Sequence, residues 1–190
     1  MPMPRVRALA TGLLAALMLA YPLAVYWGLA HLSPRTIALL LLAVLLLRWA
    51  LGPAAPWQRG ALVAAVLLAL AALAGDDALP LKLYPVAINA ALLLVFGLSL
   101  WRPPTLVERI ARRHEPALPP EGVAYTRRVT QAWCLFFALN GAAALATALA
   151  ASDEVWVLYN GLVAYGLIGT MFAGEWLVRR HVRRRWAPHV

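Results

Sequence analysis

Three amides and one carboxylate fall inside long apolar blocks of this sequence, where polar groups are expensive to place. Asn89, Asn140 and Asn160 are amides, and Glu175 is the only carboxylate within such a block. Amides between apolar helices can hydrogen-bond across a helix interface, or they can line a path for a polar substrate. Both interpretations stay open: interhelical packing, or a binding cluster made of these four residues.

Glu175 has a basic neighbour at helical spacing. Arg179 follows four residues later and therefore lies on the same face of a helix, where a local ion pair is expected. A proton-coupling role would require a carboxylate nearer the middle of the apolar block. The ion pair is therefore the simpler interpretation.

A second group of candidate residues is basic and lies between two apolar blocks. Guanidinium groups bind oxyanions, so these arginines suit lipid phosphates or the carboxylates of an acidic protein. We expect them to form one face that binds lipid headgroups or an acidic partner. That face is predicted to consist of Arg109, Arg112, Arg113, Arg127 and Arg128.

The segment that carries the first three arginines is predicted to contain a short helix. Thr105 and Glu108 have the spacing of a capping box, in which both side chains pair with free backbone amides at a helix start. The helix is expected to run to about Arg113. Its amphipathic pattern suits the cytoplasmic surface of a membrane. A proline-rich stretch then predicts extended, mobile chain through Pro116, Pro119 and Pro120.

Familiar catalytic motifs are absent from the sequence. It contains no Walker A loop, zinc-protease helix or nucleophile elbow, and no dense acidic group that could hold magnesium over a phosphate. His114 and Glu115 lack the His-four-residues-Asp spacing of membrane-bound acyltransferases. The single cysteine, Cys134, lies in an apolar block and reads as a small buried hydrophobe. We predict no metal and no cofactor, and an enzyme is the weakest functional hypothesis.

The elements that must position these residues are long apolar helices. Hydrophobic residues make up 63% of the 190-residue chain and charged residues 13%, whereas soluble domains contain about 25% charged residues. About 20 apolar residues cross a bilayer core as a helix. The sequence therefore predicts an all-α, polytopic membrane helix bundle, forming a single domain with six transmembrane helices and one short cytoplasmic interfacial helix. The predicted spans are 8–29, 36–51, 60–74, 84–101, 131–151 and 155–178, with a cytoplasmic loop at 102–130.

The start of the chain has two interpretations. Arg5 and Arg7 before an apolar run are typical of a secretory signal peptide, which ends in a small-x-small cleavage site. The run continues through Pro22 without that pattern. We expect an uncleaved first span, with a cleaved signal peptide as the alternative.

The charges between the spans predict the orientation of the bundle. With the N-terminus in the cytoplasm, fifteen of the 17 basic residues fall on the cytoplasmic side, and only Arg35 and Lys82 fall outside. The acidic pairs at 76–77 and 153–154 fall outside as well. The positive-inside rule therefore places both termini in the cytoplasm. Because the basic residues lie at span ends, the net charge of +9 predicts membrane anchoring and no nucleic-acid partner.

Several short motifs between Leu83 and Arg180 resemble one family of proteins. They are Tyr84-Pro85-Val86 with Asn89, Arg102-Pro103-Pro104, Glu108-Arg109-Ile110-Ala111-Arg112, Tyr125-Thr126-Arg127-Arg128-Val129-Thr130, Trp133-Cys134, Asn140-Gly141, Tyr159-Asn160-Gly161 and Glu175. Together they resemble an uncharacterised family of small bacterial inner-membrane proteins. That family tends to be encoded with fatty-acid-synthase-like genes for aryl polyene pigments.

The resemblance implies a setting and no particular reaction. Aryl polyenes are built on acyl carrier proteins at the cytoplasmic face and end as lipid-linked pigments in the outer membrane. A protein of the inner (plasma) membrane in that setting is expected to contact membrane lipids and to hold acyl carrier protein or soluble biosynthetic enzymes. The first hypothesis is therefore a non-enzymatic accessory protein of envelope lipid or aryl polyene biosynthesis. The second is a transporter or flippase for a lipid-linked or small-molecule substrate.

Overall fold

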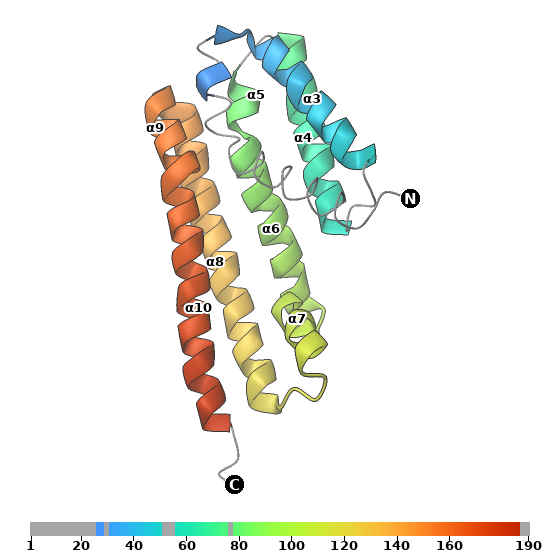
Figure 1. The fold of residues 1–190 in the computed structure, drawn as a ribbon, viewed down its shortest axis with the longest axis vertical. Coiled ribbons are helices and arrows are strands. Elements are labelled where there is room, and N and C mark those ends of the chain that lie inside the picture. Colours follow the sequence, from blue (N-terminus) through green and yellow to red (C-terminus); the bar gives the residue numbers. More distant parts are fainter. Residues whose placement is uncertain (1–25, 29–30, 51–55, 76–77, 187–190) are drawn as a thin grey trace, which may run out of the picture.

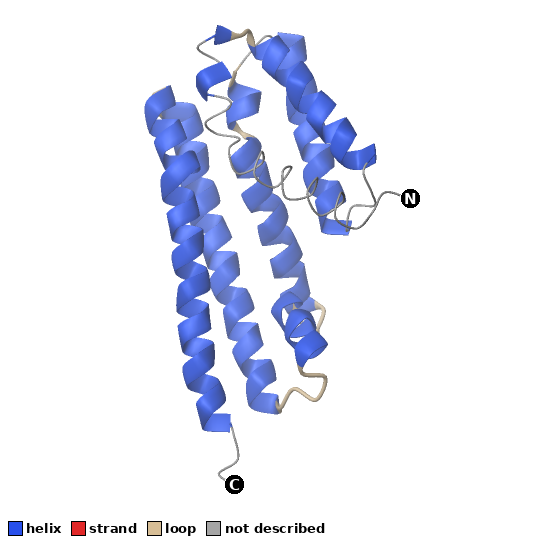
Figure 2. Cartoon of the chain, viewed as in Figure 1, coloured by secondary structure: helices blue, strands red, loops and turns tan. Residues whose placement is uncertain are grey.

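The computed structural model describes residues 26–28, 31–50, 56–75 and 78–186 of the chain. Those residues form helices and connecting turns, with no strand among them (Figure 2). The helices are α3 (Pro34–Ala50), α4 (Pro56–Gly75), α5 (Leu79–Lys82), α6 (Tyr84–Trp101), α7 (Leu106–His114), α8 (Pro120–Ala150), α9 (Asp153–Leu158), the π-helix η1 (Tyr159–Val163) and α10 (Ala164–Trp186).

Three of the described helices are long and apolar enough to cross a membrane. They are α6, α8 and the continuous rod of α9, η1 and α10 over Asp153–Val182. Their outer faces carry large exposed apolar side chains such as Leu94, Leu139 and Leu162. A soluble protein rarely exposes so large an apolar surface, whereas lipid requires one. The described part of the chain therefore has the helices and the surface of a membrane protein.

The predicted spans agree with these helices to different degrees. The span at 84–101 coincides with α6, while those at 131–151 and 155–178 lie almost wholly within α8 and the last rod. The spans at 36–51 and 60–74 overlap α3 and α4, whose apolar parts in the described residues are shorter. Most of the span at 8–29 lies outside the described residues. The total of six spans therefore stays a prediction.

The connection between α6 and α8 is shorter than the predicted loop at 102–130. α8 begins at Pro120, so residues 120–130 are helical and the expectation of extended chain is wrong from Pro120 onward. Pro119 has the extended backbone of an N-cap residue, with φ −69° and ψ 162°. Proline suits the first helical position because the first turn has no intrahelical use for its backbone N–H.

The helices pack in a row, with α6 in the middle. α8 contacts α6 along one side, and the α3–α4 hairpin meets the other side through α4 (Figure 1). The rod of α9, η1 and α10 stands beside α8. Near α5, small and apolar side chains from several helices form a buried cluster around Trp156 that includes Ile37, Ala72 and Leu81. Close packing of these side chains holds the hairpin and the longer helices together at this end.

An ion pair and hydrogen bonds also join the helices at the same end of the bundle. Lys82, at the end of α5, pairs with Asp153 at the start of α9. The indole nitrogen of Trp156 donates to the carbonyl of Lys82 over 3.2 Å. Ser152 caps α9 by accepting a hydrogen bond from the backbone N–H of Val155. These contacts fix the α8–α9 turn against the start of α6.

Toward the α7 end, aromatic rings replace the small side chains. Trp133 of α8 packs against Phe96 of α6 with ring centroids 6.3 Å apart, and against Phe172 of α10 at 4.8 Å. Phe137 stacks on the same indole at 5.4 Å. Trp133 therefore joins the three long helices at this level.

Candidate functional site

The first candidate site lies between α6 and α8, nearer their α5 end than their α7 end. The side-chain nitrogen of Asn140 donates to the side-chain oxygen of Asn89 over 3.1 Å. The Tyr159 hydroxyl donates to the side-chain oxygen of Asn140 over 2.9 Å. Asn89 in turn donates to the carbonyl of Pro85 over 2.8 Å. One chain of hydrogen bonds therefore joins α6, α8 and η1.

Close helix packing surrounds this pair of amides. A Cβ atom added to Gly141 would lie 3.0 Å from the Cβ of Asn89, which is tighter than an ordinary contact. Asn89 and Asn140 are only 7% and 6% exposed. Every buried side-chain nitrogen or oxygen among the described residues has a hydrogen-bond partner. The two amides therefore form a buried hydrogen bond that holds α6 and α8 together.

Asn160 follows Tyr159 in the chain but bonds elsewhere. Its side-chain nitrogen donates to the carbonyl of Trp156 over 2.9 Å and to the Thr147 hydroxyl of α8 over 3.3 Å. Asn160 is therefore a second polar link between the last rod and α8, next to the Asn89–Asn140 pair but not bonded to it.

The π-helix η1 explains how Asn160 keeps this position. Trp156, Asn160 and Ala164 are all buried, at a constant spacing of four. A regular α-helix has 3.6 residues per turn, so such a row drifts away from its partner, whereas a π-turn absorbs one extra residue. The expectation of a plain helix missed this turn. Its signal in the sequence is the four-residue spacing, visible once the buried face is known.

Glu175 lies away from the three amides. It is roughly 22 Å farther along the helix than Asn160, toward the α7 end. The Tyr125 hydroxyl donates to its carboxylate over 3.3 Å, and Arg179 pairs with it at 3.5 Å. The predicted ion pair with Arg179 is therefore confirmed. Of the four polar residues of the predicted cluster, the structure brings Asn89 and Asn140 into contact, places Asn160 nearby and keeps Glu175 apart.

The second candidate site is the corner formed by α7, the end of α6 and the start of α8. The Thr105 hydroxyl accepts the backbone N–H of Glu108 over 3.3 Å, which confirms the predicted N-cap. The Ser99 hydroxyl accepts the backbone N–H of Leu106 over 3.0 Å and donates to the carbonyl of Phe96. The predicted short helix is therefore present, and its first turn is fastened to α6.

Arg112 supports the corner from within α7. It pairs with the side chain of Glu108 at 2.8 Å, and Glu108 is only 5% exposed. A second nitrogen of the same guanidinium donates to the carbonyl of Pro116 over 3.2 Å. Arg112 therefore neutralises a buried carboxylate and holds the chain that leaves α7.

Two further arginines bond to carbonyls near the end of α6. Arg109 donates to the carbonyl of Pro104 over 2.8 Å and to that of Arg102 over 3.4 Å. Arg127 of α8 donates to the carbonyl of Leu100 over 3.1 Å. The last carbonyls of a helix have no intrahelical partner, so Arg127 supplies one that α6 lacks.

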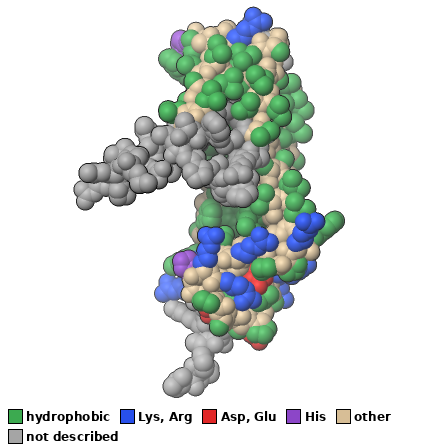
Figure 3. All heavy atoms as spheres, turned by 90° about the vertical axis from the view of Figure 1, so that its right-hand side faces the viewer, with side chains coloured by type: hydrophobic (Ala, Val, Ile, Leu, Met, Phe, Trp, Pro, Cys, Tyr) green, Lys and Arg blue, Asp and Glu red, His purple; other side chains and the backbone are tan. Residues whose placement is uncertain are grey.

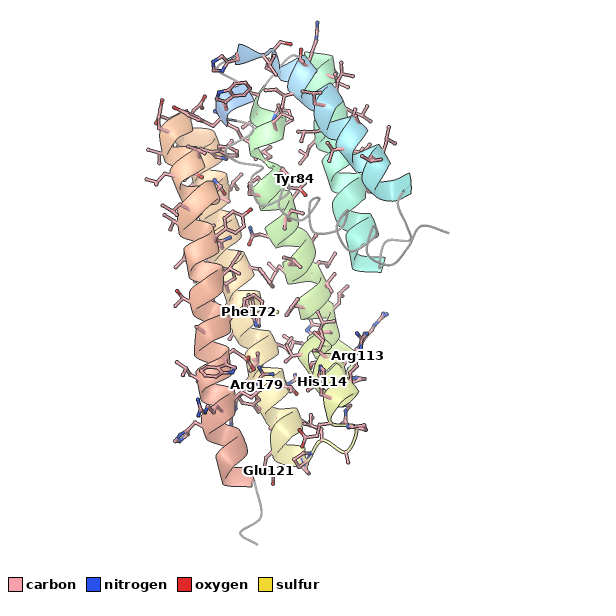
Figure 4. The ribbon with its side chains drawn as sticks, viewed as in Figure 1. Tyr84, Arg113, His114, Glu121, Phe172 and Arg179 are labelled. Carbon is pink, nitrogen blue, oxygen red and sulfur yellow. The ribbon has the colours of Figure 1, made fainter. Side chains whose placement is uncertain are left out.

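The other two predicted arginines are free of such contacts. Arg113 and Arg128 are exposed, and neither makes a hydrogen bond or ion pair with the described residues. Figure 4 shows Arg113 at the outer edge of α7, across the bundle from Arg179 on α10. The five arginines of the predicted face are therefore divided into three that bond within the corner and two that are fully available to a partner.

Comparison with known proteins does not assign this chain to a family. No protein-family model, no curated protein and no solved structure matches this chain. The resemblance to the aryl polyene-associated family stays a prediction. Within the described residues, no group of three or more His, Cys, Asp or Glu side chains could hold a metal ion.

Proposed function

We propose that this chain is a non-enzymatic accessory protein of a bacterial inner membrane that holds soluble partners at the cytoplasmic face. The observation that carries the proposal is the built corner around α7, where a capped helix contains a buried Glu108–Arg112 pair. Burying a carboxylate costs desolvation, and a loop that only connects two spans has no need of that cost. The corner also presents Arg113 and Arg128 to solvent.

In this proposal the bundle has six spans, and the α7 end faces the cytoplasm. Basic residues near that end, including Arg113, Arg128 and Arg180, agree with the positive-inside rule. The opposite end carries the acidic residues Asp153 and Glu154 at the start of α9. This distribution of charge supports a cytoplasmic N-terminus and C-terminus.

The partner that suits the corner is acidic. Exposed arginines attract a negatively charged protein and speed its association, and acyl carrier proteins are acidic. Together with the family resemblance, this complementarity supports a role in envelope lipid or aryl polyene pigment biosynthesis. In that role the protein would concentrate carrier-bound intermediates at the membrane.

A charge reversal at the two free arginines tests the docking proposal. Arg113→Glu with Arg128→Glu, in full-length protein in phosphatidylcholine nanodiscs, should weaken binding of purified acyl carrier protein by about tenfold or more, because like charges then oppose each other. Binding by the unchanged protein should fall as salt rises. Arg109 and Arg112 are poorer choices, because their reversal would also break bonds within the corner.

The matched control replaces the same two residues by lysine. Arg113→Lys with Arg128→Lys keeps both charges and should keep most of the binding. Circular dichroism should show the same helical content in all three proteins. Equal binding by the reversed and unchanged proteins, or no binding by either, would contradict docking at this face.

One observation favours the alternative of a lipid or small-molecule transporter. The Asn89–Asn140–Tyr159 bonds adjoin a π-helix, and π-turns inside helices are frequent at functional sites. A transporter should move a fluorescent phospholipid between leaflets of reconstituted vesicles faster than empty vesicles do. Asn140→Leu should abolish that movement, and an equal rate in protein-free vesicles would remove this alternative.

A further inference from the structure

The outer face of α6 changes from apolar to basic within one residue. Leu94, Leu98 and Trp101 are 61%, 50% and 87% exposed, and their spacing places them on one face of the helix. Arg102 follows directly and is also exposed. Tryptophan prefers the boundary between hydrocarbon and headgroups. Trp101 therefore marks the level at which the apolar face meets the membrane surface.

α7 extends this boundary sideways from the end of α6. Arg109, Ile110 and Arg113 are exposed on the helix, so a large apolar side chain stands between two guanidinium groups. Glu108 is the only acidic residue of α7, and it is buried against Arg112. No acidic side chain of α7 therefore competes with an anion on this outer face.

The turn between the two helices fixes one of these guanidinium groups in advance. Arg109 bonds to the carbonyls of Pro104 and Arg102 at 2.8 and 3.4 Å. Its remaining N–H groups stay at an exposed position beside Arg102. A group held in place before its ligand arrives loses little further freedom on binding.

We infer that the surface made by Trp101, Arg102, Arg109, Ile110 and Arg113 binds the headgroup of an anionic phospholipid. The guanidinium groups pair with phosphate oxygens, and the lipid chains lie along the apolar face of α6. Figure 3 shows the basic side chains gathered over the α7 part of this side of the molecule, with apolar side chains dominating above them. We call this surface the lipid corner.

Two apolar side chains indicate that this surface contacts lipid. The exposed Trp101 and Ile110 would be left in water by a partner that contacts only the arginines. Trp101 is continuous with Leu94 and Leu98, which are exposed along a candidate membrane span. The inference shares Arg113 with the proposed docking face, but it requires no soluble partner and is tested without one.

The test measures lipid retained by purified full-length protein in detergent, by native mass spectrometry, after exposure to equal amounts of phosphatidylglycerol and phosphatidylcholine. We expect the unchanged protein to retain phosphatidylglycerol about tenfold more than phosphatidylcholine, given two or three arginines near one phosphate. Arg102→Gln with Arg113→Gln should bring the two lipids to nearly equal retention. Neither side chain bonds to another described residue, so the helices should remain intact.

A charge-matched control decides whether the site is local. Arg180→Gln with Arg183→Gln removes two charges from α10, outside the lipid corner, and should keep the preference. Loss of preference in this control as well, or no preference in the unchanged protein, overturns the inference, as does a preference that survives Arg102→Gln with Arg113→Gln. If that double variant does not fold, Arg102→Gln against Arg102→Lys gives the same comparison, with lysine retaining the preference. No soluble protein is present, so failure here leaves the docking proposal standing.

Discussion

At the scale of single residues, the polar groups of the long helices are mostly joined to one another or to backbone. Asn89 and Asn140 are hydrogen-bonded to each other, and the Tyr159 hydroxyl donates to the side-chain oxygen of Asn140. Their closeness depends on Gly141, which leaves room for the Asn89 side chain on the facing helix. Small residues serve this purpose in membrane bundles, where close approach and hydrogen bonds replace the hydrophobic effect between helices.

We expect Gly141→Ala to destabilise the bundle. The new methyl group would lie 3.0 Å from the Cβ of Asn89, so Asn89 must shift by a few tenths of an ångström, which strains its hydrogen bond with Asn140. Overpacking of this kind costs about 1–3 kcal/mol, which should appear as a lower midpoint of thermal unfolding in detergent. Gly166→Ala is the matched control, since nothing lies within 4 Å of that position. Equal midpoints for the two variants would show that α6 and α8 do not meet closely at Gly141.

The amides show what a sequence can and cannot predict about a site. Their cost in an apolar setting is visible from the residue types alone, so Asn89, Asn140 and Asn160 stand out immediately. Which two amides are hydrogen-bonded depends on how α6 and α8 pack together. Tyr159 is not predicted as a site residue, because tyrosine is common near membrane helices. Glu175 was grouped with the amides although its own neighbours, Tyr125 and Arg179, lie much farther along the bundle.

At the scale of elements, predictions succeeded where local chemistry decides the outcome. α6 has the bounds of the predicted span because Pro85 suits its first turn and Pro103 follows its end. Thr105 and Glu108 marked the start of α7 correctly. The prediction places the start of α8 too late because it assigns Pro120 to an extended proline-rich stretch, although proline also begins helices. The sequence predicts one role for the five arginines, because the bonds of Arg109, Arg112 and Arg127 to backbone carbonyls depend on how α7 folds back.

Removing one partner of the buried ion pair in α7 should destabilise the helix by an amount that depends on which partner is removed. Arg112→Ala leaves the buried Glu108 carboxylate without its cation, and an unpaired buried charge costs about 3 kcal/mol or more. Glu108→Gln leaves an arginine that water can solvate, so its effect should be smaller. Limited trypsin digestion of the reconstituted protein should therefore cut near Arg113 faster in Arg112→Ala than in Glu108→Gln. Arg128→Ala should leave the rate unchanged, and equal rates for both α7 variants would contradict a buried pair.

At the scale of the whole molecule, the two ends of the bundle are built differently. The α5 end is closed by the Lys82–Asp153 pair and the Trp156 indole. The α7 end instead carries exposed arginines around a helix that lies outside the long spans. A single rule of membrane insertion accounts for this contrast, because basic residues are retained on the cytoplasmic side whereas acidic residues have little influence.

The proposed orientation of the chain rests on that contrast and can be measured directly. We expect reporter fusions at Asp77 and Asp153 to be periplasmic, and fusions after Arg113 and Arg185 to be cytoplasmic, because most of the 17 basic residues then face inward. Alkaline phosphatase, active only in the periplasm, and green fluorescent protein, fluorescent only in the cytoplasm, should give opposite results at every position. If the N-terminus is cytoplasmic, a periplasmic C-terminus would require an odd number of spans. The α7 corner would then be periplasmic as well, because α8 and the last rod are two candidate spans and the Tyr125–Glu175 bond holds α8 and α10 together at the level of that corner.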